Sequence, residues 1–262
     1  MLKNSLENHG YEIIDFKNLD YLCAIQDVIR SSFPCLPTEF HKGNFSDEER
    51  LELVKKAKDK IVEKNLVKKF LIENKEFLIQ LLGPDIDIMT DIYLRVSRPN
   101  LESDFIDWHR DTFYGNSFWE LNFWMPVFPL EKGAGLMLVE GSHLTPASNV
   151  KSVKDENKFR NQVTKGSLAN ELGYLYAPKT DDTISNIENE NVILLTPKLG
   201  QAVLFFTHVV HRAQNASSIT RVSIDLRIKN MFAPTNTKPG YFQPLARSVV
   251  THCVEKMLSI NA

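Results

Sequence analysis

Cysteine is scarce in this chain, and the few thiols present are scattered. The 262 residues contain 3 cysteines, at Cys23, Cys35 and Cys253. Their spacing forms no Cys-x-x-Cys pair and no pattern that would hold a metal ion or a disulfide framework. Isolated thiols are typical of a reducing compartment, so we expect a cytoplasmic protein with reduced cysteines.

Long apolar runs and a surplus of charge of one sign are also lacking. No stretch approaches the roughly 18 apolar residues of a membrane helix, and the polar start MLKNSLENHG has no signal-peptide character. The chain has 31 Lys and Arg against 33 Asp and Glu, with a pI near 6.4. The sequence therefore predicts no membrane and no nucleic-acid partner, and it leaves the oligomeric state open.

Helical periodicity is present in the first third of the chain. Hydrophobic residues make up 43% of the sequence, enough for a full core in one domain of this length. We expect a helical cover over residues 1–84, with a short strand at 11–16 and helical spacing at 19–32 and 67–82. Ser46 and Glu49 form a capping box for a further helix, and Gly83-Pro84 ends the helical part.

An extended pattern follows, and it predicts a β core over residues 85–232. Strands are expected over 86–96 and 104–112, before the Gly-Ser-His at 141–143, and on both sides of 197–200. The polar stretch 144–190 interrupts this rhythm, and we expect it to form a lid over a cavity mouth. A tail over 233–262 ends in a helical pattern at 246–258.

Two short pieces of the β core carry the residues that point to chemistry. His109 and Asp111 stand two positions apart, which on a strand places both side chains on one face. With 7 histidines and 33 acidic residues, about one such pair is expected by chance, so the pair alone is weak. His211 would complete two imidazoles and one carboxylate, a set that leaves coordination positions open and suits non-haem iron(II).

A segment of period two follows His211. Polar and apolar side chains alternate through it: Arg221, Ser223, Asp225 and Arg227 against Val222, Ile224, Leu226 and Ile228. The period predicts a strand with one apolar and one charged face. The charged face could lie in solvent. Alternatively, the apolar face packs under helices and the charged face lines a cavity, where an arginine could hold a dicarboxylate by two parallel hydrogen bonds.

The order of these motifs resembles a known family. Trp-His-Arg-Asp at 108–111, GAGLMLVEGSH at 133–143, and His211 with Arg221 ten residues later are similar to the phytanoyl-CoA-hydroxylase-like branch of the iron(II)/2-oxoglutarate dioxygenases. The resemblance covers roughly residues 88–230. It implies a mainly β fold with flanking α-helices, a double-stranded β-helix or jelly-roll barrel of the cupin-like kind.

The resemblance also implies the roles of individual residues. Iron(II) would be held by His109, Asp111 and His211, and the co-substrate 2-oxoglutarate by Arg221, with Ser223 and Asn122 as further contacts. Dioxygen and a small molecule would be the other reactants. Hydroxylation is favoured because halogenating relatives lack the metal carboxylate, which is present here as Asp111.

Several side chains near these motifs compete for roles. His143 and His208 are the other candidate histidines, and the ten-residue distance to Arg221 favours His211 over His208. Arg95 and Arg98 could reach an acidic substrate, but surface charge is the role that we expect of them. Tyr114 and Trp119 are candidates for a pocket wall.

Two other functions remain open at this stage. One is a cupin-type metal-dependent isomerase or lyase, which would use the same barrel without 2-oxoglutarate and would need no arginine at position 221. The other is a catalytically silent barrel that only binds a ligand.

Overall fold

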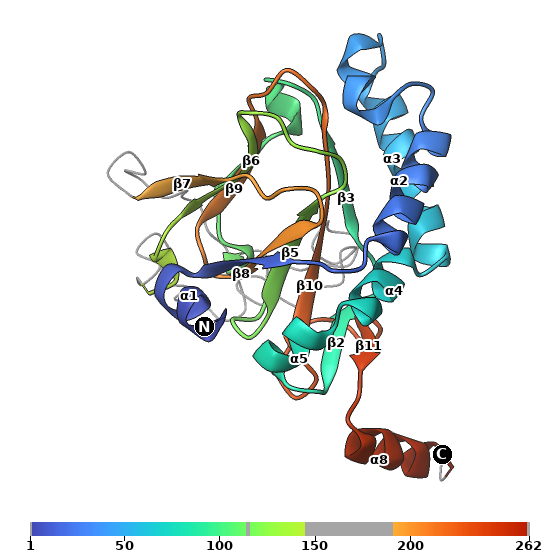
Figure 1. Cartoon of the computed structure of the whole chain (residues 1–262), viewed down its shortest axis with the longest axis vertical. Coiled ribbons are helices and arrows are strands. Elements are labelled where there is room, and N and C mark those ends of the chain that lie inside the picture. Colours follow the sequence, from blue (N-terminus) through green and yellow to red (C-terminus); the bar gives the residue numbers. More distant parts are fainter. Residues whose placement is uncertain (1, 114–115, 145–190, 261–262) are drawn as a thin grey trace, which may run out of the picture.

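Two antiparallel sheets face each other, and helices cover the outer side of the larger one (Figure 1). The computed structural model describes residues 2–113, 116–144 and 191–260. The larger sheet contains, in spatial order, β1 (Tyr11–Asp15), β8 (Gln201–Phe206), β5 (Leu121–Pro126), β10 (Arg221–Asn230), β2 (Ile86–Met89) and β11 (Phe242–Ala246), while β3 (Tyr93–Ser97) also pairs with β10. The smaller sheet contains β4 (Ile106–His109), β9 (His211–Asn215), β6 (Ala134–Val139) and β7 (Val192–Leu195). The predicted jelly-roll architecture is confirmed.

The helices lie mainly before the β core in sequence. They are α1 (Leu2–His9), α2 (Asp20–Ser32), α3 (Asp47–Glu63), α4 (Leu66–Glu73), α5 (Glu76–Leu82) and, after the core, α8 (Val249–Ile260). Short 3₁₀ turns are η1 (Pro37–Lys42), η2 (Glu102–Asp104), η3 (Asp111–Phe113) and η4 (Ser142–Leu144). Among the helices of the described residues, none combines the length and the apolarity needed to cross a bilayer.

A local sequence signal explains where α3 begins. The Ser46 side chain accepts a hydrogen bond from the Glu49 amide, and the Glu49 carboxylate accepts one from the Ser46 amide, as the capping box predicts. Such a cap contributes about 1 kcal/mol. The helical spacing over 67–82 corresponds to two helices, because the chain breaks at Asn74 between α4 and α5. The Asn74 side chain accepts hydrogen bonds from the amides of Lys17 and Asn18, a tertiary contact that helical periodicity does not reveal.

The alternation along β10 is explained by its place between two layers. All but the last of its 10 residues are buried. The apolar positions belong to the core beneath α2, α3 and α4: Val222, Ile224, Leu226 and Ile228. The polar positions therefore face the space between the two sheets, because successive side chains point to opposite faces. The alternative of a solvent-facing strand is excluded.

A smaller apolar cluster fills part of the space between the sheets. It contains Trp124, Leu136, Leu138, Leu195, Val203, Phe205 and Val209. Asn122 shares the inner face of β5 with Trp124, while Leu121 and Phe123 point outward, so polar and apolar side chains meet inside the barrel. This meeting point is where the candidate site lies.

Three features differ from the sequence-based expectation or lie beyond it. The larger sheet extends outside residues 85–232, because β1 pairs with β8 and β11 pairs with β2. The C-terminal helix begins at Val249 rather than at Ala246, since Ala246 belongs to β11. The lid expected over 144–190 lies, apart from Leu144, outside the described residues.

Candidate metal centre

Three predicted ligands meet between the two sheets. His109 ends β4 and His211 begins β9, and the two residues are directly paired across these strands, with ring centroids 4.2 Å apart. Asp111 Oδ1 lies 3.3 Å from Nε2 of His109 and 3.8 Å from Nε2 of His211. All three residues are buried, and one ligand atom from each lies within 4.8 Å of the others. The structure thus brings together two imidazoles and one carboxylate that are distant in sequence.

Asp111 reaches this position by a route that differs from the expected one. The strand ends at His109, and Asp111 opens the 3₁₀ turn η3 instead of continuing the strand. Its amide donates a 2.8 Å hydrogen bond to the carbonyl of Thr207, which fixes the start of the turn beside the β8–β9 connection. The turn, rather than strand alternation, directs the carboxylate toward the two histidines.

Both imidazoles are held with the same nitrogen inward. Nδ1 of His109 lies 2.6 Å from the Asp107 carbonyl, and Nδ1 of His211 lies 3.0 Å from the Val209 carbonyl. Because a carbonyl oxygen can only accept, Nδ1 carries the proton in each ring and Nε2 presents its lone pair toward Asp111. This is the tautomer that a metal ligand needs.

Electrostatics keep these groups in the protonation states that bind a cation. Burial, together with the neighbouring His109, lowers the pKa of His211 to about 3, so this ring is neutral at pH 7. Burial by itself would raise the pKa of Asp111, but Arg227 and the two histidines outweigh it and hold that pKa well below its usual range. A neutral imidazole and an ionised carboxylate are therefore ready to ligate.

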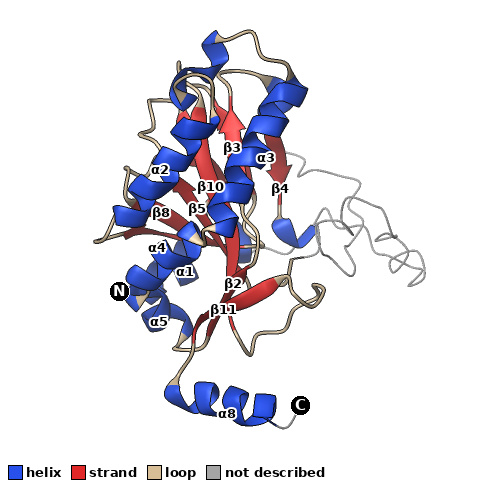
Figure 2. Ribbon diagram, turned by 90° about the vertical axis from the view of Figure 1, so that its right-hand side faces the viewer, coloured by secondary structure: helices blue, strands red, loops and turns tan. Residues whose placement is uncertain are grey.

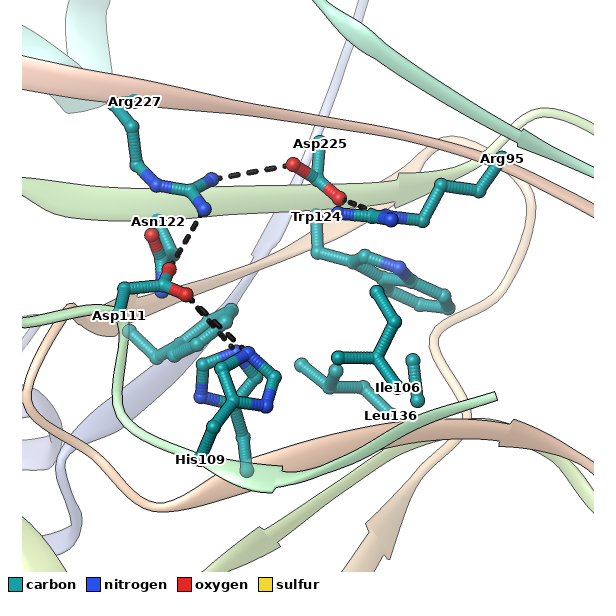
Figure 3. Close-up of a pocket in the computed structure, with 12 residues that line it drawn as sticks. Arg95, Ile106, His109, Asp111, Asn122, Trp124, Leu136, Asp225 and Arg227 are labelled. Carbon is teal, nitrogen blue, oxygen red and sulfur yellow. Dashed lines mark hydrogen bonds and ion pairs between the residues drawn. The ribbon is translucent and has the colours of Figure 1, made fainter. Parts of the chain in front are cut away.

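A pocket opens beside the three ligands (Figure 3). The space free of protein atoms in the pocket and at its open mouth is about 360 Å³. Its polar wall is formed by Arg95, Asn122, Asp225 and Arg227, and its apolar wall by Ile106, Trp124, Leu136, Phe205 and Ala213. In Figure 3, Arg227 and Asn122 lie near Asp111, whereas Arg95 lies at the opposite side of the pocket. The pocket thus has one side with the imidazoles and the Asp111–Arg227 ion pair, and a far side where Arg95 pairs with Asp225.

Arg227 joins the ligand carboxylate to a second acid. Its Nη2 lies 2.7 Å from Asp111 Oδ2, and its Nη1 donates a 3.2 Å hydrogen bond to Asp225 Oδ1. Arg95 Nε in turn donates to Asp225 Oδ2 at 2.5 Å. Asp111 therefore turns Oδ1 toward the histidines and Oδ2 toward Arg227, so that a single oxygen faces the centre.

The residues predicted for the co-substrate line two different parts of this region. Asn122 borders the pocket, and both atoms of its buried amide lack a hydrogen-bond partner among the described residues. The buried Ser223 hydroxyl is likewise without a partner in the described part of the chain. Arg221 lies outside the pocket lining, with its guanidinium carbon 5.7 Å from the Trp124 ring. Its Nη1 donates to the carbonyls of Gly135 (2.6 Å) and Gln214 (2.8 Å).

The hydrogen-bond donors of Arg221, Asn122 and Ser223 suit a polar, anionic ligand. Arg221 makes no ion pair with a carboxylate among the described residues, although only 2% of its surface is exposed. Burial, and the neighbouring Arg95, lower its pKa to about 10, so the guanidinium still carries its charge at pH 7. Buried polar groups are normally satisfied, so the unpaired atoms of Asn122 and Ser223 fit a ligand with several acceptors and a negative charge.

The structure also locates the arginines and aromatic residues that lie near the motifs in sequence. The prediction of surface charge for Arg95 is wrong, because its side chain lines the pocket. Arg98 instead pairs with Asp104 at 2.9 Å and is absent from the pocket lining. Trp119 is 66% exposed and does not border the pocket, and Tyr114 lies outside the described residues.

The two competing histidines do not join the ligand set. His208 lies in the β8–β9 connection, where its ring stacks on Phe206 at 5.2 Å. His143 Nε2 lies 2.9 Å from the Glu7 carbonyl, which ties η4 to the N-terminal helix. Within the described part of the chain, His109, Asp111 and His211 are the cluster that could hold a metal ion.

A jelly-roll barrel that holds two histidines and one carboxylate around open positions defines a class of mononuclear metal enzymes. The family model described as phytanoyl-CoA dioxygenase (PhyH) matches residues 35–223, which is more than half of the chain. The chain belongs to the phytanoyl-CoA dioxygenase family. No curated protein gives a significant match to the sequence.

Several solved structures share the fold. The epimerase SnoN in complex with Fe3+, alpha ketoglutarate and nogalamycin RO is 13% identical, with a TM-score of 0.53 over 91% of this chain and 85% of that chain. The non-heme alpha ketoglutarate dependent carbocyclase SnoK from nogalamycin biosynthesis is 14% identical, with a TM-score of 0.52 over 91% and 86%. EvdO2 from Micromonospora carbonacea var. aurantiaca is 14% identical, with a TM-score of 0.54 over 91% and 94%. At such identities the likeness shows the fold alone.

Proposed function

We propose that this protein is an iron(II)/2-oxoglutarate-dependent dioxygenase that hydroxylates a C–H bond of a small molecule. In the overall reaction, dioxygen and 2-oxoglutarate are consumed, one oxygen atom enters the substrate, and succinate and carbon dioxide leave. The observation that carries the proposal is the convergence of His109, Asp111 and His211 on a pocket whose wall includes Trp124, the ring over which the buried Arg221 guanidinium lies. Family membership adds iron(II) and 2-oxoglutarate as the cofactor and co-substrate.

The three ligands would hold the metal on one face and leave the opposite face open. Bound iron(II) would supply the oxidising power toward an unactivated C–H bond. The carbonyls of Asp107 and Val209 hold the two imidazoles in the ligating tautomer, and Arg227 holds Asp111 so that one oxygen is presented. Protein groups thereby fix the number of positions left for the co-substrate and dioxygen.

Residues in the pocket and next to it would bind and shield the co-substrate. Arg221 is proposed to pair with its distal carboxylate, with Ser223 and Asn122 supplying further hydrogen bonds. Support comes from the buried charge of Arg221 and from the unpaired polar atoms of the other two residues. The apolar wall that includes Trp124 and Leu136 would contact the methylene groups and exclude water.

Replacing Arg227 with methionine should separate the positioning of Asp111 from metal binding. Methionine keeps an unbranched apolar stem but has no donor, so Asp111 Oδ2 would be released toward the centre and would compete with the co-substrate for a position. We expect the turnover of 2-oxoglutarate to fall about 10- to 100-fold through weaker binding of the co-substrate, with iron(II) still bound at saturating metal. Separate titrations of metal and of co-substrate measure the two effects.

Arg212→Met is the matched control, because Arg212 stacks on Trp108 and does not border the pocket. It should leave both titrations unchanged. Loss of iron(II) affinity in Arg227→Met with an unchanged dependence on 2-oxoglutarate would contradict the positioning role.

Anaerobic addition of iron(II) and 2-oxoglutarate to the purified protein tests the proposed function directly. A visible charge-transfer band should appear only when both are present, because it requires them at one centre. Admission of air should then release succinate in proportion to the oxygen consumed, even without the substrate. Iron(II) binding with no response to 2-oxoglutarate would instead favour an isomerase or lyase, and failure to bind iron(II) would favour a silent ligand-binding barrel.

A further inference from the structure

Asp225 places a carboxylate in the wall of the pocket that the proposed function fills with an anion. Its side chain lies on the inner face of β10 and borders the pocket beside Arg95 and Arg227. Only 11% of the side chain is exposed, so solvent and salt screen its charge little. A buried negative charge opposes an anionic ligand, and it is costly unless it is paired. The partners of Asp225 therefore decide what the pocket can bind.

Asp225 is matched by two guanidinium groups at once. Its Oδ2 accepts the 2.5 Å hydrogen bond from Arg95 Nε, and its Oδ1 accepts the 3.2 Å hydrogen bond from Arg227 Nη1. Arg227 also pairs with Asp111, so charges of alternating sign run from the far side of the pocket to the metal ligands (Figure 3). The two positive and the two negative charges balance each other along this row.

Arg221 is the nearby cation that this row of charges leaves unmatched. It stands four positions before Asp225 on the same inner face of β10, and Arg95 is paired in register with Ser223 between them. Arg95 and Arg221 are close enough to repel each other, and after burial this repulsion is a cause of the lowered pKa of Arg221. Because Arg95 and Arg227 already have carboxylate partners, Arg221 is the arginine left for a carboxylate of the ligand.

We infer that Asp225 determines how many carboxylates the pocket accepts. Since it holds Arg95, a ligand with one distal carboxylate finds one unmatched guanidinium, and a further carboxylate would meet an acid. The inference rests on the proposed function, in which the ligand is the dicarboxylate 2-oxoglutarate. Without the Asp225 charge, Arg227 keeps Asp111, whereas Arg95 loses the carboxylate with which it pairs among the described residues. Arg95 then becomes a second anchor for an anion.

Glutarate and tricarballylate are matched probes of this selectivity, because tricarballylate is glutarate with one more carboxylate on its central carbon. Calorimetric titration of each compound into the full chain, without added metal, measures the two dissociation constants. We expect wild type to bind tricarballylate no more tightly than glutarate. Asp225→Asn should bind tricarballylate at least about tenfold more tightly than glutarate, since the third carboxylate gains charge-assisted hydrogen bonds from Arg95.

Two further variants locate the source of this gain. Arg95→Ala combined with Asp225→Asn should bind both probes as wild type does, because the released guanidinium is gone. Asp27→Asn removes the same charge from an exposed pair with Arg30 on α2 and should also match wild type. Thermal unfolding shows which variants are folded, and Asp225→Ser has the same expected result if Asp225→Asn does not fold.

A folded Asp225→Asn protein that does not prefer tricarballylate, or a wild type that already prefers it, would overturn the inference. Retention of the gain in the double variant would overturn the part assigned to Arg95. The proposed function is judged separately, by the charge-transfer band that iron(II) and 2-oxoglutarate give together. A normal band with no gain in Asp225→Asn contradicts the inference alone, and a gain without the band contradicts the proposed function alone.

Discussion

Alanine at position 111 is expected to abolish the iron-dependent consumption of 2-oxoglutarate and to weaken iron(II) binding more than about a hundredfold, since changes outside the ligand set alone cost 10- to 100-fold. The carboxylate supplies the only negative charge among the three ligands, and its Oδ1 faces both imidazoles. Without it, two neutral rings remain as ligands beside the Arg227 guanidinium, which repels a cation. Metal content after equilibrium dialysis and succinate formation from 2-oxoglutarate are the two measurements.

Asp111→Ala also lowers the stability of the fold, and this effect must be separated from the loss of the metal ligand. Arg227 would keep Asp225 but lose its contact with Asp111, and breaking a buried pair costs about 3–5 kcal/mol. Asp111→Asn removes the charge with little change of shape, so it should lose the metal while unfolding closer to the wild-type temperature. Asp107→Ala, at an exposed carboxylate on the same strand, should retain metal and turnover. Iron-dependent succinate formation by a folded Asp111→Ala protein would contradict the assigned ligand set.

Some features of the fold can be predicted from neighbouring residues alone. The period of two along 221–228 predicts both faces of β10, because a strand between a helical layer and a polar cavity must alternate in this way. The capping box at Ser46 is equally local. Both depend on residues a few positions apart, for which spacing and side-chain type are sufficient evidence.

Other features depend on contacts that spacing does not record. Arg95 points into the pocket because β3 pairs with β10 in a register that sets it opposite Ser223. A shift of one residue would have turned it outward, and nothing in the local pattern fixes that register. Asn74 breaks a helix for a similar reason, since its side chain is committed to the distant amides of Lys17 and Asn18. His109 and Asp111 lie close together although the strand ends between them, because the turn that begins at Asp111 is held by the carbonyl of Thr207. In Figure 2, the strands that carry these distant contacts lie in layers behind the helical cover.

Arg221→Ala should raise the 2-oxoglutarate concentration needed for half-maximal turnover at least about thirtyfold, while iron(II) binding stays unchanged. The expected loss is about 2 kcal/mol or more, as for a buried charge pair that loses one partner. The physical reason is that Arg221 is a buried cation without a carboxylate partner among the described residues, so an incoming carboxylate would be its missing counter-ion. Titration of the charge-transfer band with 2-oxoglutarate measures this binding without the substrate.

Arg95→Ala is the informative comparison, because Arg95, unlike Arg221, lines the pocket directly. Its charge is already matched by Asp225 at 2.5 Å, and its side chain is 32% exposed, so solvent and a partner both weaken its pull on a ligand. We therefore expect the affinity for 2-oxoglutarate in the same titration to change less than about threefold.

Arg221→Lys should recover part of the affinity that Arg221→Ala loses, since lysine keeps the charge but lacks the planar fork. If Arg95→Ala produced the large loss and Arg221→Ala the small one, the co-substrate would extend toward Arg95, and Arg221 would serve only to join Gly135 and Gln214 through their carbonyls. The metal ligands would remain as assigned in that case, because the two arginines lie apart from them.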